Sequence, residues 1–598
     1  MVGDRGDLPP AYVWDLTALC PSAGDWEMEM KRLDEQRLAS WSRVNLFRGR
    51  LTDVTTICAA LGEYFSIQRV LGKLCTYAML RHDEDLSHTL HGGMRERSHI
   101  MEMSLRESTS WLEPELVALE EGLWQELLKA SEAAPYRQWL RQLHHTKAHV
   151  LPPGEERLMA MAGMALAAPK KAFTALNNVD LQFGEVLDGE GQKRQLTHGL
   201  YQVYMKSQDR VLRENAFTGL FEQYGQHLHT ITELLNGEMQ SQLFQARGHR
   251  YRTCLEAALM PLDIPESVYT DLLEVVHEYS HVLHRYVELR RRILGLTELH
   301  SYDLHVPLVQ EVQLDIPYEQ ACQWVIESVA PLGEEYQAAV RHGLMEGRWV
   351  DVHEAKGKRS GAYSSGCYDS PPYVLMNYRG TLTDVFTLAH EIGHSMHSFL
   401  SNRNNSYAEA PYTLFAAEVA STLNEQLLFD LLLKTLTSPQ QQVYLLNQKL
   451  EEIRSTLLRQ TLFAEFELWL HQQVEEGIPL SVESLNEKYR ALIHVYYGDA
   501  LFLDPAIAWE WSRIPHFYYG YYVYQYATGL SCALSFHQQI VKEGRPAIER
   551  YLRFLKSGGS KFPVEILEQS GVDIRHGGAV RAALEEFEGL VEQLSKKL

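Results

Sequence analysis

The sequence has no long run of apolar residues and no excess of positive charge. No segment reaches the roughly 18 uninterrupted apolar residues of a membrane-spanning helix, and the N-terminal MVGDRGDLPPAYVWDL lacks the apolar stretch of a secretory signal. Lys plus Arg number 56 against 78 Asp plus Glu, a net charge of −22 that argues against nucleic acid or an anionic membrane as partner. We therefore expect a soluble protein.

Cysteine is also scarce, and the distribution of the cysteines indicates the redox environment of the protein. The 7 cysteines are scattered and form no C-x-x-C pair. Such a set is typical of a reducing compartment and not of a disulfide framework, so we expect a cytoplasmic location. A nucleotide-binding P-loop is missing as well, because Val352 stands where the first glycine before Gly357-Lys358 would be required.

What the sequence does contain is extensive helical patterning. Apolar residues recur at three-and-four spacing from about residue 25 to 176, and again from about 200 to 341. Between these regions, two short alternating runs around Asp188-Gly189 predict a β-hairpin. A chain of 598 residues is too long for a single core. We place the domain boundary at the hairpin, with an N-terminal helical domain at residues 1–197 and a second domain at 198–598.

The composition changes between residues 349 and 383, which are dense in Gly, Ser, Tyr and Pro around the apolar YVLMN. This pattern predicts a small β-sheet. A polar loop and an apolar helix from about residue 414 to 433 follow a further helical segment. The expected fold class is therefore mainly α with a minor sheet.

That further segment contains AHEIGHSMH, an H-E-x-x-H motif followed by a third histidine. On a helix, residues four apart are offset by about 40° and one turn, so His390 and His394 can bind one ion. Glu391 projects about 100° round, where a general base for attacking water has to lie. His397 falls about 10 Å beyond His390 along an unbroken helix, which makes it the weaker ligand. With 26 histidines in the chain, the motif alone does not identify a metal site.

A carboxylate downstream is the better candidate for the third ligand. Glu418 lies in LFAAEVASTLNEQLL, where apolar neighbours indicate burial, and a buried carboxylate needs a cation. Small Ala and Ser residues would let this helix approach the histidines closely. Glu425, seven residues on and on the same face, is placed to orient one histidine. A buried Glu–Arg pair, or Glu409 as the ligand, are the alternatives.

Five segments together carry a resemblance to a known family. They are TLAHEIGHSMHSF, NSYAEAPYTLFAAEVASTLNEQLL, KRSGAYSSGCYDSPPYVLMNY, PHFYYGYYVYQYATGLS and SGGSKFPVEILEQSGVD. In these segments the chain resembles the oligoendopeptidase F branch of the thimet-oligopeptidase-like zinc peptidases. The resemblance covers the chain from Lys358 onward, whereas the N-terminal half is compatible only in length and helicity.

The resemblance implies two helical lobes around a deep substrate channel, with residues 198–598 as the catalytic domain. It implies one catalytic Zn²⁺ held by His390, His394 and Glu418, with Glu391 as the base that activates water. The expected activity is hydrolysis of internal bonds of short unstructured peptides. A metal exopeptidase of related fold and a non-catalytic zinc-bearing scaffold remain alternatives, although a structural zinc site has no need of Glu391.

Two further segments are expected to contact substrate. On a helix, Tyr519, Tyr522 and Tyr526 would share an arc of about 60° with His516 just off it, and such a stripe alone is more often core packing. The resemblance implies instead that these groups bind substrate and the developing oxyanion, and leaves open which one holds the oxyanion. It also implies that an edge strand pairs with the peptide backbone, unless that strand is an ordinary buried one. Its residues are Tyr373, Val374, Leu375, Met376 and Asn377.

Overall fold

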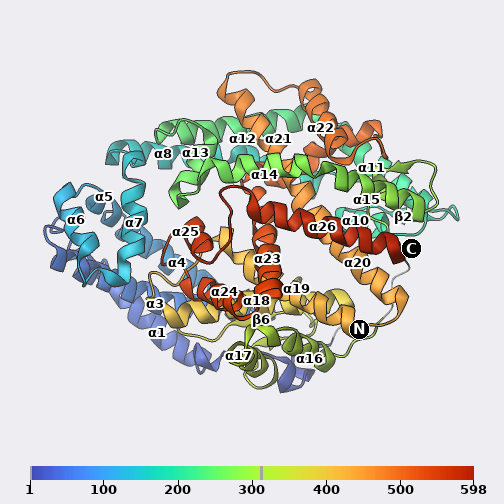
Figure 1. Ribbon diagram of the computed structural model, residues 1–598. Helices are drawn as coiled ribbons and strands as arrows, with labels where there is room; N and C mark the ends of the chain where they lie inside the picture. Colours follow the sequence, from blue (N-terminus) through green and yellow to red (C-terminus); the bar gives the residue numbers. More distant parts are fainter. Residues whose placement is uncertain (1–2, 310–313, 598) are drawn as a thin grey trace. The chain divides into compact units, whose positions relative to one another are not determined.

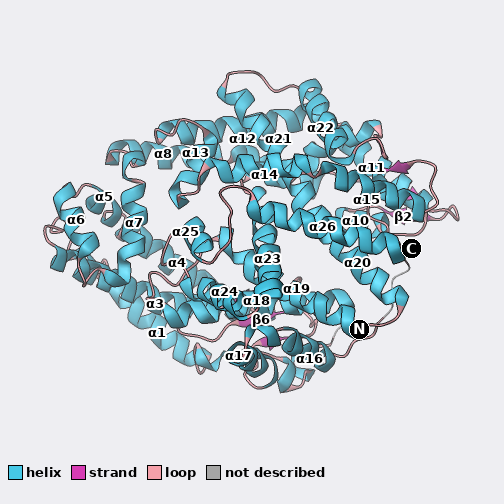
Figure 2. Ribbon diagram, in the orientation of Figure 1, coloured by secondary structure: helices cyan, strands magenta, loops and turns pink. Residues whose placement is uncertain are grey.

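The computed structural model describes residues 3–309 and 314–597, most of them in helices, as Figures 1 and 2 show. The chain divides into two compact units, each built from three separate stretches. Unit 1 comprises Met1–Val150, Gln313–Lys434 and Phe536–Val572, and unit 2 comprises Leu151–Val312, Thr435–Ser535 and Asp573–Leu598. The expected sequence boundary after residue 197 stays a prediction.

Unit 1 contains a small three-stranded sheet among helices. Its helices are α1 (Ala23–Leu38), α2 (Ser42–Asn45), α3 (Val54–Glu84), α4 (Thr89–Ser108), α5 (Leu112–Val117), α6 (Glu121–Lys129), α7 (Arg137–His145), α16 (Tyr318–Ser328), α17 (Glu334–Met345), α18 (Leu382–Asn404), α19 (Leu414–Thr435), α24 (Arg545–Ser557) and α25 (Pro563–Gln569). Its strands are β4 (Val350–Asp351), β5 (Tyr363–Ser365) and β6 (Tyr373–Leu375).

Unit 2 is also helical and contains two short strand pairs. Its helices are α8 (Pro153–Leu166), α9 (Ala168–Ala175), α10 (His198–Met205), α11 (Arg210–Gly225), α12 (Leu228–Gly248), α13 (Cys254–Leu259), α14 (Glu266–Glu278), α15 (Ser280–Ile293), α20 (Pro439–Ile453), α21 (Arg459–Glu475), α22 (Val482–Tyr497) and α26 (Gly578–Lys597). Its strands are β1 (Glu185–Leu187), β2 (Lys193–Gln195), β3 (Leu299–His300) and β7 (Leu501–Phe502). Helix α23 (Tyr524–Glu543) begins in unit 2 and ends in unit 1.

The predicted fold class is confirmed. Strands β1 and β2 pair antiparallel across Asp188-Gly189, as the hairpin prediction required. The small sheet lies between residues 350 and 375, and the apolar helix after the H-E-x-x-H motif is α19. Within the described part of the chain, no helix has both the length and the apolarity needed to cross a bilayer.

The position of β6 corrects the prediction that Tyr373 to Asn377 form an edge strand. The strand order is β4-β6-β5, so β6 is central, with β4 parallel on one side and β5 antiparallel on the other. Tyr373 and Leu375 belong to the hydrophobic core of unit 1. Both edges of β6 are thus occupied, and the alternative of a buried strand is correct. A strand needs unpaired N–H and C=O groups to accept a peptide, and in this sheet β5 is an edge strand.

The helix that follows this sheet is fixed at its start by its own sequence. Thr381 caps α18 by accepting a hydrogen bond from the backbone N–H of Asp384, and the Asp384 carboxylate accepts one from the N–H of Thr381 in return. From there α18 runs unbroken to Asn404 and lies beside β6 and α24 (Figure 1). The register of its side chains is therefore set from the first turn.

Helices α18 and α19 meet at one glycine. A Cβ atom added to Gly393 would lie 2.5 Å from the Cα of Ser421 and 2.6 Å from the carbonyl oxygen of Ala420. Both atoms belong to the backbone of α19, which cannot move aside as a flexible side chain can. The side chain of Asn424 adds a hydrogen bond to the carbonyl oxygen of Ala389. The close approach expected from the Ala and Ser residues of α19 is confirmed, and it also requires Gly393 on α18.

This contact generates a stability prediction. Gly393→Ala should destabilise the protein by about 1–3 kcal/mol, because the added methyl forces the two helix backbones apart. Gly589→Ala in α26 is the matched control, since nothing lies within 4 Å of its added Cβ. The control should be neutral or stabilising by up to about 1 kcal/mol. Denaturant unfolding of both variants measures this, and equal stabilities would contradict the tight contact.

Candidate metal centre

Two consecutive helices of unit 1 bring three metal-ligating side chains together. The Nε2 atoms of His390 and His394 lie 3.2 Å apart, and Oε2 of Glu418 lies 3.5 Å from the first and 3.6 Å from the second. Zinc–ligand bonds of about 2.0–2.1 Å in a tetrahedron separate the ligand atoms by about 3.3 Å. Among the described residues, this is the one such group of His, Cys, Asp or Glu side chains that could hold a metal ion. The donors present therefore fit zinc.

Glu425 holds one of the histidines from behind. Its Oε1 lies 2.5 Å from Nδ1 of His390, which places the Nδ1 proton in a hydrogen bond and leaves Nε2 facing the cluster. Burial lowers the pKa of His390, but the hydrogen bond to Glu425 and the nearby carboxylates outweigh it and raise that pKa to about 9. Burial and the charge of His390 lower the pKa of His394 to about 4. The carboxylates around the two imidazoles favour a bound cation.

Glu391 stands beside the cluster and outside it. Its side chain is buried, and burial raises its pKa to about 7, although the charge of His390 and a hydrogen bond from the backbone N–H of Ser364 lower it. Ser364 belongs to β5, and its hydroxyl lies 2.8 Å from that of Ser395 on α18. This link between β5 and α18 was not anticipated from the sequence, because Ser364 is one of many serines in a loop-like segment.

Glu418 is more exposed than the sequence predicted. Its side chain is 39% exposed, so burial does not by itself demand a cation. The apolar neighbours Phe415, Val419 and Ala420 are buried, whereas Glu418 occupies the more open face of α19. Where most residues of a helix are small, the sequence does not show which of them are buried and which are exposed. The placement beside the histidines is nevertheless as predicted.

His397 lies apart from the cluster, as expected for an unbroken helix. Its ring is 1% exposed and stacks on Tyr412 with centroids 3.7 Å apart, with Phe554 at 5.2 Å. Burial lowers its pKa to about 3. His397 is therefore a neutral ring packed between aromatic groups.

The second predicted group of residues gathers in unit 2. The ring of His516 lies 6.4 Å from Tyr519, 6.1 Å from Tyr522 and 5.8 Å from Tyr526. The hydroxyl of Tyr526 donates to that of Tyr522 at 3.4 Å. Tyr519 is 56% exposed, and Lys170 lies over its ring at 3.6 Å. The intervening tyrosines 518, 521 and 524 are buried.

The reason for this grouping differs from the one predicted. The segment is not one helix: α23 begins only at Tyr524, and Gly520 and Tyr521 have φ values of 60° and 50°. The backbone N–H of Tyr521 donates to Glu467 at 2.7 Å, which stabilises this left-handed turn. The sequence did not single out Glu467, although it shows much the same signal as Glu418: it is one of two carboxylates among apolar residues in LFAEFELWL.

Comparison with known families gives two matches along the chain. The family described as peptidase family M3 matches residues 203–586, and the one described as oligopeptidase F matches residues 115–183. Oligopeptidase PepF of Bacillus subtilis is 39% identical over 597 residues, which are 100% of this chain and 88% of that protein. Group B oligopeptidase PepB of Streptococcus agalactiae is 36% identical over 596 residues, 99% of this chain and 98% of that protein.

Solved structures show the same fold. A crystal structure of a Chlamydophila abortus protein superposes with a TM-score of 0.95 at 40% identity and covers 100% of both chains. Oligoendopeptidase-F from Enterococcus faecium superposes with a TM-score of 0.73 at 33% identity, covering 95% of this chain and 99% of that one. The similarity extends through both compact units.

The geometry predicts how metal binding depends on three side chains. Glu418→Ala should lower zinc affinity at least as severely as His394→Ala, because each removes one of three converging ligand atoms. His397→Phe should retain stoichiometric zinc, because its ring packs between aromatic groups and a phenyl ring can replace it. Metal analysis of the three purified variants measures this. An empty site in His397→Phe together with a full one in Glu418→Ala would refute the assignment.

Proposed function

Because the chain belongs to peptidase family M3 and is a metallo-endopeptidase, we propose that zinc is its metal and that it cuts internal bonds of short unstructured peptides. The observation that carries this proposal is the convergence of His390, His394 and Glu418, with Glu391 beside them. A structural zinc site needs no carboxylate next to its ligands, whereas a hydrolytic one needs a base.

The three ligands leave one tetrahedral position for chemistry. A zinc ion held by His390, His394 and Glu418 would polarise the peptide carbonyl as a Lewis acid and make water easier to deprotonate. His390 and His394 would bind as neutral imidazoles, and Glu418 would contribute one negative charge. Glu425 would keep the proton of His390 on Nδ1, so that Nε2 carries the free lone pair.

Glu391 is the proposed general base. It would take a proton from the attacking water onto a carboxylate oxygen and then deliver it to the nitrogen of the leaving amine. A group that performs both transfers works best with a pKa near the working pH, and burial raises the pKa of Glu391 to about 7. A cation bound beside it would favour the carboxylate, which is the form that accepts the proton.

The tyrosines and His516 of unit 2 are proposed to hold the substrate and the developing oxyanion. Phenol hydroxyls donate hydrogen bonds without adding a permanent charge, which suits an oxygen that becomes negative only during the reaction. Burial, with the charge of Arg459, lowers the pKa of His516, so this ring would be neutral when substrate arrives. Their contact with substrate, like the deep channel implied by the resemblance, stays an expectation.

The peptide backbone is proposed to pair with β5 instead of β6. An extended peptide adds to a strand whose outer N–H and C=O groups are unpaired, and side-chain identity then matters little. The backbone N–H of Ser364 donates to Glu391, which places β5 beside the base, and a peptide would pair with the other outer groups of this strand. Residues 373–377 would support this strand from behind.

A product-mapping experiment tests the proposed activity. A mixed pool of unstructured peptides and one folded protein would be incubated with the enzyme, and products identified by mass spectrometry with and without a chelator. Internal cuts in the peptides, lost on chelation and restored by zinc, are expected. Removal of single terminal residues would instead favour an exopeptidase, and intact peptides in the presence of bound zinc would favour a scaffold.

The role of Glu391 predicts a separation of binding from turnover. Glu391→Gln should retain stoichiometric zinc while kcat falls by about 10²–10⁴-fold, because the base is lost and the ligands stay. Glu425→Gln is the comparison: its zinc affinity should fall by about 10–100-fold, with a smaller loss of kcat once zinc is saturating. Zinc analysis and peptide kinetics on both variants measure this. Full activity of Glu391→Gln would exclude it as the base.

A further inference from the structure

A polar cavity lies within unit 2 and plays no part in the proposed reaction. Its volume is about 40 Å³. Its walls combine apolar side chains with a set of hydrogen-bond donors from several helices. The polar and charged lining consists of Tyr201, Ser301, His305, Arg454, Arg459, Tyr489, Tyr497 and one carboxylate, Glu510. Two guanidinium groups on one small cavity raise the question of what balances their charge.

The carboxylates nearby balance only half of the positive charge. Glu451 is shared between Arg290 at 3.1 Å and Arg454 at 2.7 Å. Glu510 is shared in the same way between Arg459 and Arg513, the latter at 3.6 Å. Among the described residues, the ion pairs of these four guanidiniums end on those two carboxylates. Arg290 and Arg454 are almost completely buried, so water does not compensate for the surplus.

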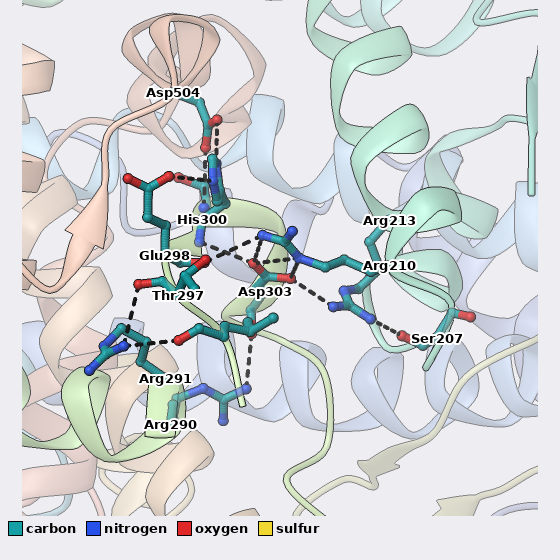
Figure 3. A network of polar contacts seen from close by, with 12 residues as sticks. Ser207, Arg210, Arg213, Arg290, Arg291, Thr297, Glu298, His300, Asp303 and Asp504 are labelled. Atoms are coloured by element: carbon teal, nitrogen blue, oxygen red, sulfur yellow. Dashed lines mark hydrogen bonds and ion pairs between the residues drawn. The ribbon is translucent and has the colours of Figure 1, made fainter. Parts of the chain in front are cut away.

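Figure 3 shows that a further carboxylate, that of Asp303, does not neutralise these guanidiniums. Asp303 binds Arg210 at 2.9 Å and Arg213 at 2.7 Å through its two carboxylate oxygens. Arg290 reaches this residue only at its backbone carbonyl oxygen, 3.2 Å away. Asp303 is therefore already shared between two guanidiniums of its own and does not neutralise Arg290.

Three donors in or near the cavity have no acceptor in the described structure: the hydroxyl of Ser301 and the Nε–H groups of Arg290 and Arg513. Ser301 is only 6% exposed. Arg454 donates to Nδ1 of His305 at 3.4 Å, so the proton of a neutral His305 ring sits on Nε2 and makes that atom a donor. Burial and the charges of Arg454 and Arg459 lower the pKa of His305 well below its usual value. The surroundings of this ring are thus positive.

We propose that this cavity binds a small inorganic anion, with chloride as the representative ligand. Surplus positive charge and unpartnered donors are the two features that an anion satisfies and a water molecule satisfies only in part. A cavity of about 40 Å³ has room for about three water molecules, which admits a halide with one or two waters and excludes a nucleotide or a peptide side chain.

The anion would tie together two segments of unit 2. Arg454 precedes α21, Arg459 is its first residue, and Ser301 and His305 follow strand β3. The ion pair between Arg459 and Glu510 links the cavity to the 3-10 segment Pro505–Arg513, which leads toward His516. Binding of the anion would stabilise unit 2. This proposal does not depend on the metal centre or on the proposed reaction.

Thermal unfolding of the full chain in matched salts tests the proposal. At equal ionic strength, Tm should be about 2–4 °C higher in sodium chloride or bromide than in sodium gluconate, whose anion is too large for the cavity. Crystals grown in bromide should show an anomalous peak beside Arg454 and Arg459. Equal Tm values in all three salts, with no peak, would overturn the proposal.

A matched pair of variants separates anion binding from general salt effects. His305→Glu supplies a fixed negative charge, and His305→Gln has nearly the same size and keeps an oxygen acceptor for Arg454 but adds no charge. His305→Glu should be the more stable of the two in gluconate, and its Tm should no longer respond to chloride. His305→Gln should keep the chloride response. If the variants do not fold, the bromide peak in the unaltered protein decides, since a cavity that holds water only gives none.

Discussion

The contact between Gly393 and the backbone of α19 is the constraint on which the metal centre depends. Two histidines four residues apart on α18 present their Nε2 atoms 3.2 Å apart, but a third ligand must come from another element. The missing Cβ of Gly393 lets the backbone of Ser421 approach closely, three residues after Glu418. Any larger residue would move α19 away, and Glu418 would move with it. Glu425, which lies on α19 and hydrogen-bonds His390, would move as well.

Each unit contains a cluster of charged side chains in which one sign of charge predominates, and the sign differs between the two units. Around His390 and His394 the carboxylates of Glu391, Glu418 and Glu425 gather without an Arg or Lys partner among their ion pairs in the described structure, which favours a divalent cation. In unit 2, guanidiniums outnumber the carboxylates that they share. Buried charge is costly unless compensated, so each imbalance indicates a ligand of the opposite sign.

Much of the metal centre was predictable because its geometry is local. Helical periodicity relates His390, Glu391, His394 and His397 without reference to the rest of the fold, and the structure keeps that helix unbroken. The position of Glu418 beside the two histidines was also predicted, although from an incorrect estimate of its burial.

Features that depend on distant partners were not predictable. Sequence does not reveal that Glu467 fixes the turn at Tyr521 and delays the start of α23, or that β5 covers one edge of β6.

The central claim is that His390, His394 and Glu418 together bind one zinc ion. A crystal structure of the zinc-loaded protein, with diffraction measured on both sides of the zinc edge, tests this most directly. We predict one anomalous peak about 2.0–2.2 Å from Nε2 of both histidines and from a carboxylate oxygen of Glu418. A stoichiometric peak coordinated by His397, or one without Glu418, would contradict the account.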